Sequence, residues 1–359
     1  MLWLEIFNCN QHWKIDVDNK RNNLFDLMRI IAAYAVMYSH YHAFVKIPEP
    51  MVFGIVSVGT LAVIVFFSIS GYLITYSYLN SKDNLEYLFK RCKRIFPALF
   101  FCSIFMVYFI CPVFGNGNAI KYITSKNALL TFIDYATLGW VPIDTNGFAS
   151  TYMHRNSLNG SLWSLGYEFT AYILLMLILD KKNFMKLKML ISTAICIIIA
   201  YISNQLKVPA DIRHFINDNF ILFSSVARGS LYFIPFAVGS LLALTRDWWN
   251  LAKVKIFLVA FGIVIIFLFS KKTITDTAFF FSIPFIILPI AVSFKDRLVN
   301  GRFDISYGLY IYAYPIQQIV ANELSLSFWS GLLVSIVITT SIAIASWTFI
   351  EKPAIKFKW

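Results

Sequence analysis

Residues 52–79 read VFGIVSVGTLAVIVFFSISGYLITYSYL and contain no charged side chain. A helix of about 20 apolar residues crosses the hydrocarbon core of a bilayer, so this stretch predicts a transmembrane helix. The rest of the chain is similar, because 58% of its 359 residues are hydrophobic and only 14% are charged. A soluble domain usually carries about 25% charged residues. The composition therefore excludes a soluble fold and predicts an all-α, polytopic bundle of membrane helices.

Apolar stretches recur along the chain and predict about ten spans. They are residues 24–45, 52–79, 95–114, 162–179, 189–203, 219–245, 256–270, 277–294, 304–321 and 329–350. No segment between them is large enough to bury a core of its own. We therefore expect one membrane domain at residues 24–350, flanked by an N-terminal segment at 1–23 and a tail at 351–359.

The net charge of +12 is distributed as a topology signal. With the N-terminus in the cytoplasm, 21 of the 31 lysines and arginines fall in inner segments, eight in outer segments and two within spans. Cytoplasmic segments of membrane proteins carry an excess of these residues. The distribution therefore predicts that both termini are cytoplasmic, and it explains the charge without a nucleic-acid partner. The five cysteines lack metal-ligand spacing, so we predict no metal site.

The long outer segment at residues 115–161 is rich in Gly, Asn, Ser, Thr and aromatic residues. Amides and aromatic rings suit a sugar-binding surface. Trp and Tyr also gather at membrane interfaces for reasons of solvation alone. Both interpretations of this segment stay open at this point.

Span 1 carries the most informative polar residues. A charge inside a span costs roughly 2.5 to 3.5 kcal/mol on insertion scales, so each one needs a reason. At 100° per residue, His40 lies within about 20° of Arg29 and about 40° of Asp26, and this stripe should face the bundle interior. Arg29 would lie near the inner end and His40 ~16 Å further out. The alternative is an interfacial ion pair of Asp26 with Arg29, and a His40 that serves only packing.

A basic stretch, Lys90-Arg91-Cys92-Lys93-Arg94, precedes Pro97 at the inner end of span 3. We predict that this stretch is a loop that runs into span 3. Arg91 and Arg94 are three residues apart, a spacing that would put them on one face of a helix, and they could make forked contacts to phosphate. With Arg29 nearby, the pattern favours an anion-binding pocket. Ordinary positive-inside charge and anionic lipid binding are the alternatives.

Glu168 lies near the predicted outer end of span 4, at a depth similar to His40. A carboxylate at that depth could hold the imidazole in one tautomer. The alternative is an ion pair with Arg228 in span 6.

Six short motifs follow one another on this ten-span frame. They are Leu24-Phe25-Asp26-Leu27-Met28-Arg29 with His40, Phe66-Phe67-Ser68-Ile69-Ser70-Gly71-Tyr72-Leu73-Ile74, Arg91-Cys92-Lys93-Arg94-Ile95-Phe96-Pro97, Ser161-Leu162-Trp163-Ser164-Leu165-Gly166-Tyr167-Glu168, Ile305-Ser306-Tyr307-Gly308-Leu309-Tyr310 before Pro315, and Glu351-Lys352-Pro353. In this order they resemble the acyltransferase 3 family of bacterial membrane O-acyltransferases, over residues 22–353.

The resemblance implies transfer of an acyl group, usually acetyl from acetyl-coenzyme A, to a hydroxyl of a surface carbohydrate or glycolipid. It implies a multi-pass protein of the bacterial cytoplasmic (inner) membrane. The expected partners are acyl-coenzyme A, a surface glycan or lipid-linked sugar acceptor, and membrane lipid.

Residue by residue, Arg29 and His40 match the family's span 1 pair. Arg91 and Arg94 match its inner arginine pair, and Glu168 matches the acid after its Trp-Ser-Leu motif. One departure is clear, because the family often has His two residues before the proline at 315, where this chain has Ala313. The role of that His is absent here or has moved to Tyr312 or Tyr314.

This chemistry needs a donor site and a base for the hydroxyl proton. We expect coenzyme A to bind at the inner arginines while its arm reaches His40, which acts as the base or carries the acyl group itself. Ser70 could line the donor channel, or serve close helix packing with Gly71. A transporter or flippase for a glycolipid is the rival interpretation, and a lipid-anchored precursor synthase is a third.

Overall fold

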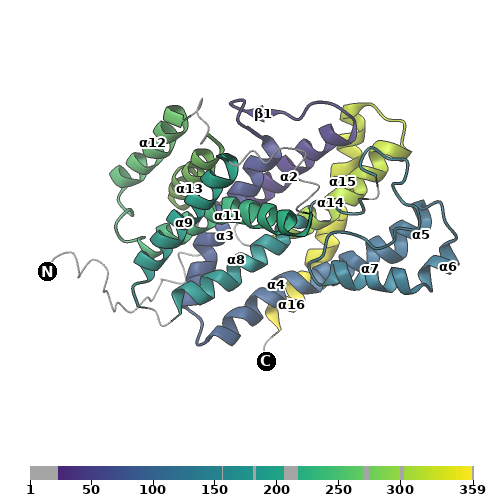
Figure 1. Ribbon diagram of the computed structural model, residues 1–359, viewed down its shortest axis with the longest axis horizontal. Helices are drawn as coiled ribbons and strands as arrows, with labels where there is room; N and C mark the ends of the chain where they lie inside the picture. Colours follow the sequence, from purple (N-terminus) through teal and green to yellow (C-terminus); the bar gives the residue numbers. More distant parts are fainter. Residues whose placement is uncertain are drawn as a thin grey trace. The chain divides into compact units, whose positions relative to one another are not determined.

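The computed structural model describes residues 23–155, 157–180, 183–205, 217–269, 275–299 and 303–357. Nearly all regular structure in this part of the chain is helical, which confirms the all-α class (Figure 1). The helices are α2 (Phe25–Phe44), α3 (Val58–Leu79), α4 (Asn84–Ile104), η2 (Phe105–Ile110), α5 (Cys111–Phe114), α6 (Ala119–Ile123), α7 (Lys126–Ala136), α8 (Trp163–Leu179), α9 (Met185–Gln205), α11 (Asn217–Leu244), α12 (Ala252–Phe269), α13 (Thr275–Ser293), α14 (Ser306–Glu323), α15 (Phe328–Ser346), η3 (Trp347–Glu351) and α16 (Lys352–Lys356). Two short antiparallel strands, β1 (Met51–Val52) and β2 (Val56–Ser57), form a hairpin.

Each of the ten predicted spans overlaps a helix or a continuous helical run. Among the described residues, seven runs are long and apolar enough to cross a membrane. They are Val58–Leu79, Asn84–Phe114, Met185–Ser203, Val226–Leu244, Ala252–Phe269, Asp276–Ser293 and Phe328–Lys356. α8 is apolar but shorter, and α2 and α14 are outside the seven, so the total of ten spans stays a prediction.

α2 and α14 carry polar residues that a lipid-facing helix would not tolerate. α2 contains Asp26, Arg29 and His40, and α14 contains Gln317 and Gln318, both of which are fully buried. Polar side chains of membrane helices almost always face the bundle interior or a water-filled cavity. The low hydropathy of these two helices therefore indicates an internal position.

The span predicted at 52–79 begins later, at Val58. Residues 51–57 instead form the β1–β2 hairpin, in which Met51 pairs with Ser57 and Val52 pairs with Val56. Its turn places Phe53 at φ 52° and Gly54 at φ 69°. Two successive residues with positive φ suit a tight hairpin turn and cannot continue a right-handed helix.

The basic stretch at 90–94 is helical, so the loop prediction there is wrong. α4 begins at Asn84 instead of 95, and Pro97 lies inside it. Neighbouring groups in a membrane bundle can satisfy the backbone that a proline leaves unpaired. The last helical run likewise continues past the predicted end at 350, through η3 and α16 to Lys356.

Some predicted features lie outside the described residues. They include four of the predicted outer cations, Lys207, Arg213, Lys271 and Lys272, and the terminal stretches 1–22 and 358–359. The cytoplasmic position of both termini therefore stays a prediction.

The described chain divides into two compact units. The first contains α9, α11, α12 and α13 with most of α3 and α8. Within it α11 packs against α9 and α13, and α12 packs against α13. The second unit contains nearly all of α2, most of α4, the helices from η2 to α7, and α14 to α16.

Glycines set the closest helix packing in the first unit. A side chain added to Gly71 on α3 would overlap the carbonyl of Phe236 on α11, and one added to Gly239 would overlap the carbonyl of Ser68. Ser240 Oγ also donates to the Gly71 carbonyl at 3.2 Å. Small residues let membrane helices approach in this way. The contacts support the packing interpretation of the Ser70-Gly71 pair, and the predicted donor-channel role of Ser70 stays a prediction.

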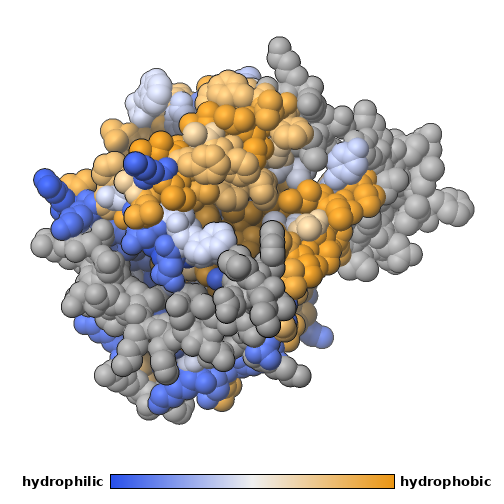
Figure 2. All heavy atoms as spheres, turned by 90° about the vertical axis from the view of Figure 1, so that its left-hand side faces the viewer, coloured by the Kyte–Doolittle hydropathy of each residue, from blue (hydrophilic) through white to orange (hydrophobic). Residues whose placement is uncertain are grey.

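The outward face of α12 is strongly apolar. Ile256, Phe257 and Phe267 are each 65–70% exposed. Figure 2, which views the molecule from the left of Figure 1, shows hydrophobic atoms over the upper part of that face, at the height where α12 lies in Figure 1. A surface of this kind suits contact with lipid. Together with the seven apolar helical runs, it makes the chain a multi-pass membrane protein.

Candidate active site

In the second unit, α2 contacts α14 and Asp304, two residues before the start of α14, at two levels. Near the start of both helices, Arg29 Nη1 lies 3.7 Å from the carboxylate of Asp304. Near the other end of α2, the His40 ring lies 5.7 Å from the ring of Tyr314 in the middle of α14, measured between centroids. The two helices therefore run in the same direction, and the polar stripe of span 1 faces the bundle interior as expected.

The first level is an ion cluster around Arg94, which we call the Arg94 cluster (Arg29, Arg94, Asp304 and Glu351). Arg94 Nη2 lies 2.5 Å from Asp304, and Arg94 Nη1 lies 3.2 Å from Glu351. Glu351 is only 1% exposed, and Ser346 Oγ donates to it at 3.1 Å. A half-buried carboxylate, Asp304, and a buried one, Glu351, thus hold the guanidinium for which the sequence predicted a phosphate contact.

Tyr307 extends the Arg94 cluster along α14. The guanidinium carbon of Arg94 lies 5.7 Å from the Tyr307 ring centroid, and the Tyr307 hydroxyl donates to the carbonyl of Ile95 at 2.9 Å. Glu168 acts electrostatically on Tyr307. Seven residues, or ~10 Å of helical rise, separate Tyr307 from Tyr314. The predicted pairing of Glu168 with His40 stays a prediction.

The second level is an aromatic group that we call the His40 cluster (His40, Phe44, His154 and Tyr314). Phe44 lies 5.2 Å from His154 and 4.9 Å from Tyr314 between ring centroids. His40 is half-buried, and its Nδ1 is buried without a hydrogen-bond partner among the described residues. A buried polar atom left unpaired in this way is unusual and is a mark of functional sites.

Tyr314 is held firmly in this cluster. Its hydroxyl and Ser157 Oγ are hydrogen-bonded at 3.0 Å, and a side chain added to Gly160 would come within 2.8 Å of its ring. Tyr312, the other tyrosine considered from the sequence, packs its ring 5.9 Å from that of Phe105. Tyr314 is therefore the tyrosine that belongs to the His40 cluster.

Two ionisable neighbours of His40 were missed by the sequence analysis. They are Glu49 and His154, the ionisable groups near its ring. Glu49 accepts a hydrogen bond from Ser39 Oγ at 2.6 Å. The carbonyl of His154 accepts one from Gln318 Nε2 at 3.2 Å. Both residues come from connecting segments, so no helical spacing indicates them.

The acyltransferase domain family model matches residues 22–349. The chain belongs to the acyltransferase 3 family. The matched region contains the whole His40 cluster and every member of the Arg94 cluster except Glu351.

Two curated relatives cover nearly the full length of this acyltransferase. An O-acetyl transferase of Shigella phage Sf6 is 33% identical over 334 residues, which are 92% of this chain and 96% of the relative. Nodulation protein 10 of Rhizobium leguminosarum bv. viciae is 28% identical over 361 residues, with 94% of each chain covered. No solved structure matches the chain.

The motifs of this acyltransferase meet along α14. The hydroxyls of Ser164 and Tyr310 lie 2.5 Å apart, and the Tyr310 hydroxyl donates to the Ser161 carbonyl at 2.8 Å. Asn159 Nδ2 donates to the Ile311 carbonyl at 2.8 Å. Asp304 and α14 therefore contact the motif residues of α2, α4 and α8 at and between the two clusters.

Proposed function

We propose that this acyltransferase transfers an acetyl group from acetyl-coenzyme A to a hydroxyl of a surface carbohydrate or glycolipid at the bacterial cytoplasmic membrane. The donor binds on the cytoplasmic side and the acceptor on the outer side. The observation that carries the proposal is the arrangement on α2, where Arg29 joins the Arg94 cluster and His40 joins the aromatic cluster. At 1.5 Å per residue, the eleven residues between them span ~16 Å. One helix thus links a cationic end to an imidazole.

The relatives support the identity of the acyl group. The phage relative is named an O-acetyl transferase and is 33% identical over almost all of its length. The excess of cations in the predicted inner segments supports the assignment of sides.

His40 supplies the proton transfer in this proposal. The imidazole takes the proton of the acceptor hydroxyl, and the oxygen attacks the carbonyl carbon of the thioester. A C–O bond forms, the C–S bond breaks, and the coenzyme A thiolate takes the proton from the imidazolium. Attack by His40 itself, through an acyl-imidazole, gives the same products.

The donor phosphates need cations that can contact them. Arg94 is bound by Asp304 and Glu351, and Arg91 lies one turn earlier on α4 in the same basic stretch, so we assign the principal phosphate contact to Arg91. Arg29, at 3.7 Å from Asp304, is the second candidate. Arginine suits this role because its planar fork matches phosphate geometry.

We expect Arg91→Ala to raise the KM for acetyl-coenzyme A roughly tenfold with little change in kcat, because one charge-assisted hydrogen bond is lost. Arg91→Lys should recover part of the affinity, since a lysine keeps the charge without the fork. Steady-state acetylation by membranes at matched protein levels measures both constants. Lys93→Ala, which removes the same charge from the same helix, is the control. An unchanged KM in Arg91→Ala would identify the basic stretch as topological charge.

The proposed function is tested by adding acetyl-coenzyme A with a radiolabelled acetyl group to membranes that contain the protein. We expect label in a glycan or glycolipid fraction, and none in membranes without the protein. A mass difference of one acetyl group between the surface glycans of a parent strain and its deletion mutant would identify the acceptor. Movement of an unmodified glycolipid across the membrane, with no acetyl incorporated, would instead support the flippase.

A further inference from the structure

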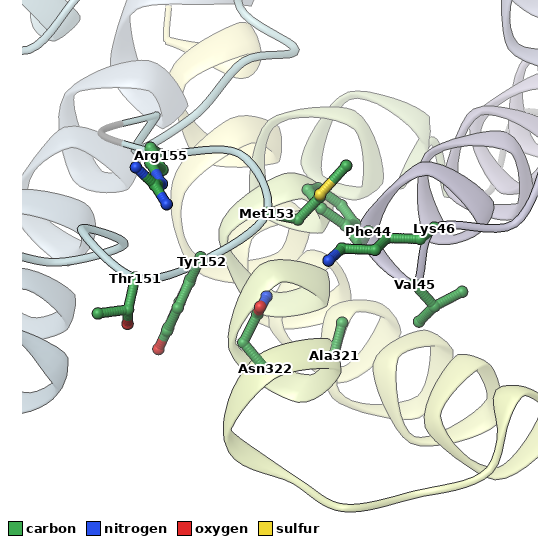
Figure 3. Close-up of a pocket in the computed structure, with 9 residues that line it drawn as sticks. All are labelled: Phe44, Val45, Lys46, Thr151, Tyr152, Met153, Arg155, Ala321 and Asn322. Atoms are coloured by element: carbon green, nitrogen blue, oxygen red, sulfur yellow. The ribbon is translucent and has the colours of Figure 1, made fainter.

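A cleft of about 470 Å³ opens beside the His40 cluster. Its walls come from the last residue of α2 and the two that follow, from the loop at residues 151–155, and from the end of α14 (Figure 3). All of these lie in the second unit. Ligand sites in proteins usually measure about 300 to 1,000 Å³, so the cleft can hold one or two sugar rings.

Phe44 connects the cleft to the reacting group. Its ring lines the cleft and also lies 6.4 Å from the His40 ring and 4.9 Å from Tyr314, between centroids. A molecule that rests on Phe44 in the cleft is therefore one side chain away from the imidazole. The apolar face of a pyranose ring packs well on such an aromatic surface.

The charged side chains in the cleft wall are both cations, Lys46 and Arg155. Figure 3 shows them reaching in from opposite sides, with the Asn322 amide between them. In the described part of the chain no acid forms an ion pair with either one. The nearby Glu323 accepts a hydrogen bond from the Tyr152 hydroxyl, and burial together with this carboxylate raises the pKa of Tyr152, which therefore stays neutral.

Lys46 occupies a backbone position that does not favour a lysine. It follows the end of α2 with φ 60°, in the left-handed region where helices usually place glycine. A lysine that occupies such a position against its conformational preference points to a use for the side chain. The position also permits a clean test, because glycine relaxes the backbone there while it removes the charge.

From these observations we infer that the cleft binds the acceptor through an anionic group, a sugar carboxylate or a phosphate, held between Lys46 and Arg155. The inference rests on the proposed function, since it names the acceptor class of the same site. The sugar ring lies over Phe44, and Asn322 and Thr151 can hydrogen-bond its hydroxyls. This arrangement directs a free hydroxyl of the ring toward His40.

Ligand-observed NMR titrations of the full chain, purified in detergent without acetyl-coenzyme A, test the site directly. The probes are methyl glucuronide, glucose 1-phosphate and the neutral methyl glucoside. We expect at least one anionic probe to bind more tightly than methyl glucoside, and its affinity to fall as salt rises. Binding of the glucuronide alone identifies a carboxylate as the natural group, and binding of the phosphate alone identifies a phosphate.

Charge-removing variants assign the binding to the cleft. Lys46→Gly and Arg155→Gln should each lower the affinity for the anionic probe roughly tenfold, the effect of losing one charge-assisted contact. Lys126→Gln, which removes an exposed cation from α7, should leave affinity unchanged. Equal affinity for methyl glucoside, or parental affinity in the double variant, would overturn the inference. These titrations contain no acyl donor, so they test the anion site separately from the acetylation assay. If membranes acetylate an acceptor but the anionic probes do not bind, the proposed function stands and this inference fails. If the probes bind but no acetylation occurs, the anion site stands and the proposed function fails.

Discussion

Replacing His40 with alanine is expected to lower acetyl transfer by roughly 10² to 10⁴, the range that a positioned general base contributes. The ring lies among Phe44, His154 and Tyr314, and its buried Nδ1 has no partner in the described part of the chain. Its removal therefore breaks no hydrogen bond of that nitrogen, and the protein should reach the membrane in normal amounts. Acetylation by membranes at matched protein levels measures the effect.

His42→Ala is the matched control, because it removes an imidazole two residues away on the same helix. The His42 Nδ1 contacts the Tyr38 carbonyl at 2.8 Å, and the His42 ring packs on Phe328. We expect its turnover per folded molecule to change by less than about tenfold, below the range for a lost base. Near-normal turnover in His40→Ala would refute His40 as base or acyl carrier and direct attention to Tyr314.

The same assay decides which acid orients His40. Glu49 accepts a hydrogen bond from Ser39, the residue before His40, whereas the sequence analysis named Glu168. If Glu49 is the orienting acid, Glu49→Gln should lower kcat strongly and Glu168→Gln should leave most of it. A strong loss of kcat in Glu168→Gln and a small one in Glu49→Gln would instead support the pairing of His40 with Glu168 that the sequence analysis predicted.

The helices could be predicted because few backbone conformations are stable in the hydrocarbon core of a bilayer. A backbone that cannot reach water must form helices, so a long apolar run such as 58–79 specifies its own structure. The boundaries were less predictable where charge and helix coincide. α4 extends to Asn84 through Lys90 and Arg91, and these charges lower the local hydropathy, so a basic helix was taken for a loop.

Half of the candidate site followed from periodicity within one helix. Arg29 and His40 share a face of α2 by spacing alone, and that face does meet the acid before α14 and a tyrosine on it. The other members could not be found in this way. His154 is 114 residues from His40 in the sequence, and only the folding of the 151–155 loop over the end of α2 brings them together. Asp304 is an ionisable residue at the start of the predicted span 304–321, but its partner Arg94 could not be inferred without the tertiary structure.

Arg94→Ala is expected to destabilise the folded protein by roughly 3 to 5 kcal/mol, the usual cost of leaving a buried charge unpaired. Arg94 is the cation that contacts both Asp304 and Glu351, at 2.5 and 3.2 Å, and Glu351 is almost fully buried. The expected result is a large loss of protein in the membrane and a lower unfolding temperature in detergent. This differs from the effect on donor affinity that the sequence alone predicts for Arg94.

A double variant separates the structural role of Arg94 from a donor-binding role. Glu351→Gln removes the unpaired charge and keeps a group that can accept the hydrogen bond from Ser346, so Arg94→Ala with Glu351→Gln should recover much of the lost stability. If Arg94 instead serves the donor, the single variant will fold normally with a raised KM for acetyl-coenzyme A, and Glu351→Gln will not rescue it. Lys93→Ala again controls for the change in net charge. Recovery of abundance in the double variant would therefore assign Arg94 to the scaffold that fixes α4 against the start of α14, and would leave Arg91 and Arg29 as the residues that meet the donor.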